Sequence, residues 1–257
     1  GLAKPEALLD DPNEHVRTWA VRLLTDKWPI DSLFGPRKNL LPKGNPKLEK
    51  KFVELAKSDS SGLVRLALAS TLQRVPVSSR GELAQALASR TEDGKDHNLP
   101  AMVWYGITPM AESDPQALVG VARATKWTNL RLWIARSLTD QAKERPEGLQ
   151  ALLSLIMDQP ANSDALLLGM EEAFRGIKKV EAPRNWSRMR AKLGKRPAVL
   201  RLSALFGDEG VMDDFAELAA NGDLSSEVRR RALQSLIEAR SPNLRKLCMD
   251  LLADGEL

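Results

Sequence analysis

The stretch Ser61-Gly-Leu-Val-Arg-Leu-Ala-Leu-Ala-Ser-Thr-Leu72 decides the fold, because its pattern recurs along the chain. In each copy an aliphatic residue directly precedes Arg. Counted from this aliphatic residue, position +4 is apolar and position +8 is Leu. Apolar residues at this spacing line one face of a helix. The full copies begin at Val16-Arg17, Val64-Arg65, Leu130-Arg131 and Val228-Arg229, and Leu200-Arg201 with Ala204 is a weaker copy.

The copies are regularly spaced. Val16 and Val228 lie 212 residues apart, which makes six intervals of about 35 residues when helical stretches near Pro100 and Ala165 are counted as silent copies. A helical pair of this length cannot bury its apolar face alone and needs neighbours to stack on it. We therefore expect an all-α fold, a right-handed α-solenoid of about seven HEAT-like, armadillo-related helix pairs, the last of them incomplete.

The domain organisation follows from the same pattern. A repeat array needs no second core, so residues 1–257 are expected to form a single HEAT-like repeat domain. Residues 28–46 contain four prolines and two glycines, which break helices, and are expected to form an inserted loop. Residues 241–253 match one helix of a further pair. Since a finished solenoid closes with polar capping repeats, we expect the chain to be excised from a longer multidomain protein.

The sequence carries little catalytic chemistry. Its histidines are His15 and His97 and its one cysteine is Cys248, so nitrogen and sulfur ligands cannot assemble a zinc cluster. No G-x-S-x-G, P-loop or G-x-G-x-x-G motif occurs. A polar cluster of Asp96, His97 and Asn98 could supply a general base, but a helix entry explains it more simply. We expect no enzymatic activity, no metal and no cofactor in these residues.

The recurring arginines occupy one repeat position and form what we call the arginine ladder: Arg17, Arg65, Arg131, Arg201 and Arg229. Stacked helices would align several of them along one surface. Such a row could hold phosphate, or each arginine could pair with an acidic residue of the adjacent repeat. We favour the structural role, because residues in repeat-defining positions usually serve stacking.

Positive charge is concentrated in residues 175–196, the basic segment. The chain has a net charge of +4, whereas the basic segment holds nine basic residues and one acidic residue. It could bind a nucleic-acid backbone while Trp186 stacks on a base, or it could bind an acidic protein surface. A solvated helix and loop with Trp186 buried is the reading we favour. The candidate contact residues are Arg175, Lys178, Lys179, Arg184, Trp186, Arg188, Arg190, Lys195 and Arg196.

Tryptophan is the other enrichment, with six residues in the chain. Large aromatic side chains commonly fill the space between repeats, so packing is the default expectation. Trp104 and Tyr105 are adjacent, however, and cannot both face inward on one helix. One of the two is therefore a candidate contact on a groove.

Three stretches carry a resemblance to a known family: Asp11-Pro-Asn-Glu-His-Val-Arg-Thr-Trp-Ala-Val-Arg-Leu-Leu24, Leu63 to Arg74, and Asp96-His-Asn-Leu-Pro-Ala-Met-Val-Trp-Tyr-Gly106. They resemble the HEAT-repeat segment of large planctomycete and verrucomicrobial proteins. In that family a sugar-dehydrogenase-like β-propeller precedes the repeats and a c-type cytochrome domain with Cys-x-x-Cys-His follows. The present chain contains neither. The resemblance implies an exported, periplasmic parent protein that binds haem in a separate domain.

Two functions from different classes follow. The first is a non-catalytic HEAT-repeat scaffold or protein-interaction module that links redox domains, its partners being other domains of the same polypeptide or another protein. The alternative is a nucleic-acid-binding, DNA-repair type of HEAT-like protein that uses residues 175–196. A solenoid built for duplex DNA should carry basic residues in nearly every repeat, and this one does not. We expect a monomer, and no membrane span because no apolar run reaches 18 residues.

Overall fold

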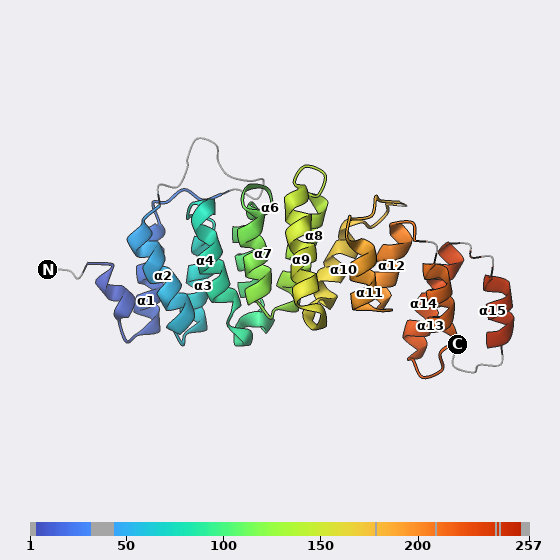
Figure 1. The fold of residues 1–257 in the computed structure, drawn as a ribbon. Coiled ribbons are helices and arrows are strands. Elements are labelled where there is room, and N and C mark those ends of the chain that lie inside the picture. The colour runs from blue at the N-terminus through green and yellow to red at the C-terminus, as the bar shows by residue number, and fades with distance from the viewer. Residues whose placement is uncertain are drawn as a thin grey trace. The chain divides into compact units, whose positions relative to one another are not determined.

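The computed structural model describes residues 4–31, 44–177, 179–208, 210–239, 241 and 243–252, and all regular secondary structure in these ranges is helical (Figure 1). The all-α class predicted from the sequence is therefore confirmed. The chain divides into two compact units, one that ends at Asp158 and one that begins at Gln159. Each unit has its own packed helices and its own core.

The first unit begins with a 3₁₀ turn at Ala7–Asp10, and further turns lie at Val77–Ser79 and Thr91–Lys95. Its helices are α1 (Glu14–Thr25), α2 (Pro46–Ser58), α3 (Gly62–Thr71), α4 (Arg80–Ala88), α5 (Leu99–Ile107), α6 (Met110–Ser113), α7 (Pro115–Ala124), α8 (Thr128–Asp140) and α9 (Pro146–Asp158). Within the expected loop 28–46, residues 32–43 lie outside the described residues, and the last residue, Pro46, already begins α2.

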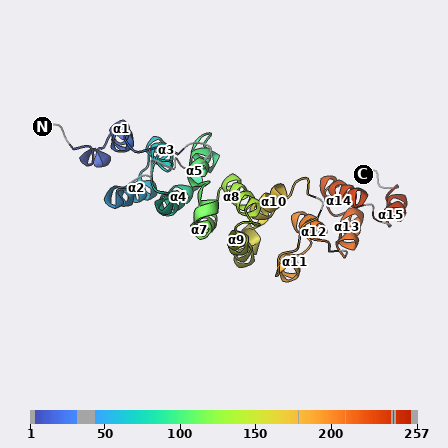
Figure 2. The same ribbon diagram turned by 90° about the horizontal axis from the view of Figure 1, so that it is seen from above.

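The helices of the first unit form two layers (Figure 2). Helices α1, α3, α5 and α8 pack side by side in one layer, which we call the arginine layer because it carries Arg17, Arg65 and Arg131. Helices α2, α4, α7 and α9 pack side by side in the second, opposite layer. Contacts also cross between the layers, as between α4 and α5 and between α7 and α8. Each helical pair is thus covered by the next pair.

Side-chain caps start several of these helices. The Ser61 hydroxyl accepts from the Val64 N–H at 3.3 Å at the start of α3. The Asp114 carboxylate accepts from the Ala117 N–H at 3.0 Å at the start of α7, where Pro115 occupies the first turn. Each cap satisfies a backbone donor that has no partner inside the helix. These residues therefore set the point at which each helix enters its layer.

Close packing joins neighbouring helices of the arginine layer. Gly106 of α5 lies so near α3 that a Cβ atom at this position would be 2.3 Å from the Leu72 Cβ atom. Leu72 is fully buried, as are Val64 and Leu68 of α3. A glycine at this crossing lets two backbones approach where any side chain would separate them.

A buried arginine in the opposite layer holds three segments together. Arg80, the first residue of α4, is fully buried. Its guanidinium donates to the Val75 carbonyl at 2.9 and 3.0 Å, to the Gly106 carbonyl at 2.7 Å, and to the carboxylate of Asp31. Burial lowers the pKa of Arg80, and the Asp31 carboxylate opposes that shift. Arg80, at the start of α4, therefore links Asp31, in the segment that follows α1, to Gly106 of α5.

The second unit contains a 3₁₀ turn at Pro160–Asn162 and the helices α10 (Asp164–Ala173), α11 (Trp186–Leu193), α12 (Pro197–Leu205), α13 (Val211–Ala220), α14 (Ser226–Glu238) and α15 (Leu244–Leu251). Helix α12 packs on α10, α11 and α13, and α13 packs on α14 and α15. A core cluster of Leu200, Val211, Phe215, Ala219, Ala232 and Leu236 lies among α12, α13 and α14. Helix α15 covers one side of it with Leu244, Leu247 and Leu251.

Candidate protein-docking surface

Arg65 of the arginine ladder joins three segments of the first unit. It is buried, with 3% of its surface exposed, and its Nε and Nη2 atoms donate to the two carboxylate oxygens of Asp93 at 2.5 and 2.6 Å. Its Nη1 atom donates to the Asp59 carbonyl, just beyond the end of α2, at 2.8 Å. Arg65 thus fastens α3 to the preceding helix and to the turn that leads into α5.

Arg17 repeats this arrangement one helical pair earlier. Its Nε and Nη2 atoms donate to the Asp59 carboxylate at 2.7 and 2.9 Å, and its Nη1 atom donates to the Asp11 carbonyl at 2.8 Å. Burial raises the pKa of Asp59, but the hydrogen bonds from Arg17 and from the Ser61 N–H outweigh it. The pKa of Asp59 is therefore held below its ordinary value, and the carboxylate stays charged between α1 and α3.

The other ladder positions keep parts of the same pattern. Arg201 donates through Nε and Nη2 to the Glu171 carboxylate of α10 at 2.6 and 2.9 Å. Arg131 and Arg229 donate through Nε to the carbonyls of Ala122 and Ala219, each at 3.1 Å, near the ends of α7 and α13. A cation at a helix C-terminus satisfies carbonyls that lack partners and complements the helix dipole. Helix packing thus accounts for the recurring arginine.

The polar cluster at residues 96–98 caps a helix. The Asp96 carboxylate accepts from the Asn98 N–H at 2.8 Å and from the Leu99 N–H at 2.7 Å, at the start of α5. Because these N–H groups stabilise the charged form, the pKa of Asp96 lies below its ordinary value. His97 is exposed beside it. The geometry gives Asp96 a structural task that explains its position without a reaction.

Carboxylates of the second unit engage much of the basic segment. Arg190 of α11 forms ion pairs with Asp208, which precedes α13, and with Asp214 of α13. Lys195 pairs with Asp214 at 3.1 Å and also with Glu217. These pairs neutralise charge that the sequence alone presents as a continuous positive run.

The remaining basic-segment residues differ in accessibility. Arg196 donates to the Pro160 carbonyl at 2.7 Å and pairs with Asp164 at 3.1 Å. Arg175 lies 3.7 Å from Glu172. Lys179, Arg184 and Arg188 are exposed, whereas Lys178 lies outside the described residues.

Trp186 is not a surface residue, which corrects its place among the candidate contacts. Only 4% of Trp186 is exposed, and its indole N–H donates to the Ser203 hydroxyl at 2.9 Å. Its ring packs edge-on against Phe206, with centroids 4.8 Å apart. The apolar ring is more stable in this packed site than in water, so it cannot stack on a nucleic-acid base without unfolding α11.

Aromatic side chains occupy one register in the arginine layer. Trp19, Trp104 and Trp133 each lie six residues after the N-cap residue of their helix, α1, α5 and α8. The Trp104 and Trp133 rings are in contact, with centroids 6.2 Å apart and an interplanar angle of 39°. Tyr105 is 50% exposed and Trp19 is 57% exposed. We call Trp19, Trp104, Tyr105 and Trp133 the aromatic row.

The three tryptophans of the aromatic row differ from the buried Trp127 and Trp186 in the hydrogen bonding of the indole N–H. The indole N–H of Trp127 donates to the Arg90 carbonyl at 2.8 Å, as that of Trp186 does to a hydroxyl. Among the described residues, no acceptor faces the indole N–H of Trp19, Trp104 or Trp133. Their donors are thus available to a bound partner, although the Arg22 guanidinium lies over the Trp19 ring, 5.5 Å from its centroid.

The opposite layer has a different surface. Among the described helices of the first unit, the large hydrophobic residues exposed to solvent are Trp19, Leu23 and Tyr105, all in the arginine layer. The opposite layer exposes charged residues, which include Lys47, Lys50, Glu54, Lys57, Glu82, Arg123, Glu147 and Asp158. The arginine layer exposes charged residues too, among them Glu14, Arg22, Arg136 and Asp140. The two layers therefore differ in their exposed large hydrophobic residues, which favour the arginine layer as a protein interface.

The sequence analysis missed the aromatic row as a group. It was based on the Val-Arg pattern, which α5 lacks, so Trp104 had no position in the repeat. Counting from the cap residues Asn13 and Asn98 would have aligned Trp19 with Trp104. The sequence did indicate that one of Trp104 and Tyr105 is a surface contact, and Tyr105 is the more exposed of the two.

Within the described ranges, no group of three or more His, Cys, Asp or Glu residues is arranged to hold a metal ion. Within the same ranges, no helix has the length and apolar character needed to cross a membrane. Comparisons with protein-family models, with curated proteins and with solved structures found no match.

Proposed function

We propose that the chain is a non-catalytic protein-interaction module that docks a partner on the aromatic row. The observation that carries this proposal is the set of three tryptophans at one helix register, two of them in ring contact, all with indole donors unused by described residues. Tryptophan and tyrosine combine apolar area with a polar tip, and they supply much of the binding energy at protein interfaces.

The proposed architecture is a right-handed α-solenoid of HEAT-like helix pairs. It is supported in the first unit by the two layers and by the repetition of one arginine contact at Arg17 and Arg65. Stacked pairs of this kind present extended surfaces to partners. In such an array the aromatic row is spread over α1, α5 and α8, which suits a partner that lies across several helices.

The partner that we propose is a redox domain, either of the same polypeptide or of a separate protein. This part of the proposal rests on the resemblance to the HEAT-repeat segment that, in its family, lies between a β-propeller and a c-type cytochrome domain. It implies export to the periplasm, with haem held by the other domain. The module itself acts as a monomer that keeps the redox domains in position.

A site-specific cross-linking experiment tests the docking surface. Benzoylphenylalanine replaces Tyr105 in the arginine layer, and in a matched control it replaces Gln150, which is exposed on α9 in the opposite layer. We expect a discrete cross-linked species, within one polypeptide or between two, from position 105 alone. Trp133→Ala should abolish it, because the neighbouring ring contact is lost. Equal cross-linking from both positions, or from neither, would refute the docking proposal.

The same experiment separates the choice of partner from the docking surface. A cross-linked species that shows the absorbance of c-type haem identifies the redox domain. A discrete species from position 105 without haem retains the docking surface but overturns the redox partner.

Nucleic-acid binding is measured in parallel, with single-stranded and duplex DNA at two salt concentrations. Submicromolar affinity that falls steeply with salt would favour the alternative function. The burial of Trp186 and the carboxylate partners of Arg190 and Lys195 do not support that alternative.

A further inference from the structure

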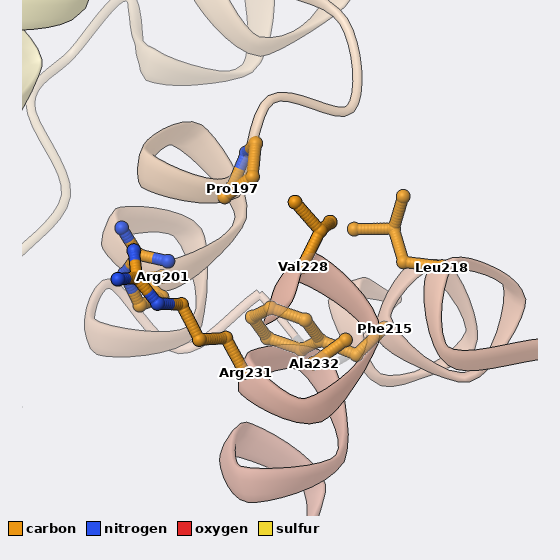
Figure 3. Close-up of a pocket in the computed structure, with 7 residues that line it drawn as sticks. All are labelled: Pro197, Arg201, Phe215, Leu218, Val228, Arg231 and Ala232. Carbon is orange, nitrogen blue, oxygen red and sulfur yellow. The ribbon is translucent and has the colours of Figure 1, made fainter. Parts of the chain in front are cut away.

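A small cavity lies among α12, α13 and α14 of the second unit (Figure 3). Its volume is about 40 Å³. Its apolar wall consists of Pro197, Phe215, Leu218, Val228 and Ala232. A cavity of this volume holds about three groups of the size of a water molecule or a methyl group. The apolar part therefore fits a branched aliphatic group of three carbons better than a ring or a long chain.

Two arginines complete the lining. Arg201 comes from α12 and Arg231 from α14, and in Figure 3 the Arg231 side chain extends toward Arg201. No carboxylate lines the cavity among the described residues. A ligand in the cavity therefore meets hydrocarbon on one side and guanidinium groups on the other.

The two arginines are held with different strength. Arg201 is fixed by its two hydrogen bonds to Glu171, which use Nε and Nη2. Arg231 pairs through Nη2 with Glu227 on its own helix, and the two side chains are 65% and 72% exposed. Exposed pairs of this kind contribute little to stability, so Arg231 can exchange its partner at small cost. Arg201 is the fixed part of the cavity, and Arg231 is the part that adjusts.

We propose that this cavity binds a carboxylate that carries a short branched aliphatic group. The aliphatic group would displace water from the wall formed by Phe215 and Val228, while the carboxylate would accept from Arg231 and from the remaining Nη1 edge of Arg201. Guanidinium groups bind carboxylates through paired, charge-assisted hydrogen bonds. Two sources share this chemistry: a free short-chain acid, and the C-terminal residue of a polypeptide that ends in Val or Leu.

The proposal is independent of the docking function, since the cavity belongs to the second unit and the aromatic row to the first. Titration of the protein with isovalerate, followed by NMR shifts of the Val228 methyl groups, tests it directly. We expect saturable binding in the millimolar range by isovalerate. Isovaleramide, which has the same shape without the charge, should bind at least tenfold more weakly. Acetate, which has the charge without the branch, should also bind at least tenfold more weakly.

A variant and a matched control complete the test. Arg231→Gln should weaken isovalerate binding at least tenfold, whereas Arg188→Gln, which removes an exposed charge from α11, should not change it. Both substituted residues are exposed, and thermal denaturation verifies that both variants remain folded. Equal binding of isovalerate and isovaleramide, absence of saturable binding, or no effect of Arg231→Gln would overturn the proposal.

The source of the carboxylate is decided with peptides. A tetrapeptide that ends in Val with a free carboxylate is compared with its C-terminal amide and with isovalerate. Tighter binding of the free peptide than of isovalerate indicates a polypeptide C-terminus, and equal binding indicates a free acid. Loss of binding in the amide is required in either case, and binding of the amide as tight as that of the free peptide would overturn the proposal.

Discussion

Replacement of Asp93 by Ala should strongly destabilise the first unit. Asp93 is 6% exposed and Arg65 is 3% exposed, so the variant leaves a guanidinium buried without its carboxylate. Removing one partner of a buried ion pair typically costs about 3–5 kcal/mol, because the remaining charge is neither solvated nor paired. Arg65 keeps its hydrogen bond to the Asp59 carbonyl, which places the expected loss near the lower end of that range, about 3 kcal/mol.

A comparison pair gives the scale for this loss. Arg123 and Asp158 form an ion pair at 2.9 Å, with side chains that are 48% and 57% exposed. Asp158→Ala should therefore cost at most about 1 kcal/mol. The double variant Arg65→Met, Asp93→Ala should regain much of the loss caused by Asp93→Ala alone, because it no longer buries an unpaired charge.

Urea unfolding followed by circular dichroism at 222 nm measures the free energy of unfolding of each variant. Tryptophan fluorescence gives a second signal, to which Trp127 contributes as one of six tryptophans; its ring lies against Gly94, next to the substituted residue. The reasoning would be refuted by a loss from Asp93→Ala no larger than that from Asp158→Ala. A double variant less stable than Asp93→Ala would also contradict it.

Three further predictions concern packing and pH. Because the pKa of Asp59 is lowered in the folded state, its contribution to stability is present above the ordinary value of 3.8 and is lost as the pH falls through the lower folded value; melting temperatures of wild type and Asp59→Asn should therefore differ at pH 7 and approach each other only as the pH falls below 3.8. Gly106→Ala should cost about 1–3 kcal/mol in urea unfolding because its Cβ atom meets Leu72, whereas Gly222→Ala, which meets nothing within 4 Å, should be close to neutral. Trp186→Phe should cost about 1–3 kcal/mol, since it leaves a buried hydroxyl without its donor, and an unchanged melting temperature would contradict this assignment.

The sequence predicted the helices well where its signals are local. Helix α7 begins at Pro115, where Asp114, Pro115 and the apolar spacing all indicate the same start. The Ser61 cap of α3 is a local signal of the same kind. Helix start signals depend on residues within one turn of each other, so they can be recognised without knowledge of the fold.

Contacts between distant residues could not be predicted in the same way. Arg80 is the largest fully buried side chain among the described residues, yet its acceptors lie at Asp31, Val75 and Gly106, and nothing at position 80 itself indicates burial. Likewise, the basic segment was identified by its charge, but the acidic residues that neutralise Arg190 come from later in the chain. Local charge counts therefore overestimate the positive surface that a folded chain presents.

The arginine ladder has a consequence for how the chain tolerates mutation. At Arg131 and Arg229 the acceptors reported above are backbone carbonyls near the end of a neighbouring helix, at Ala122 and Ala219. Every amino acid supplies such a carbonyl, but Ala122 and Ala219 are themselves fully buried, so a larger residue at either position would shift the helix end that presents the carbonyl. Each junction therefore restricts both of its partners: the arginine by its donor groups, and the alanine by its size.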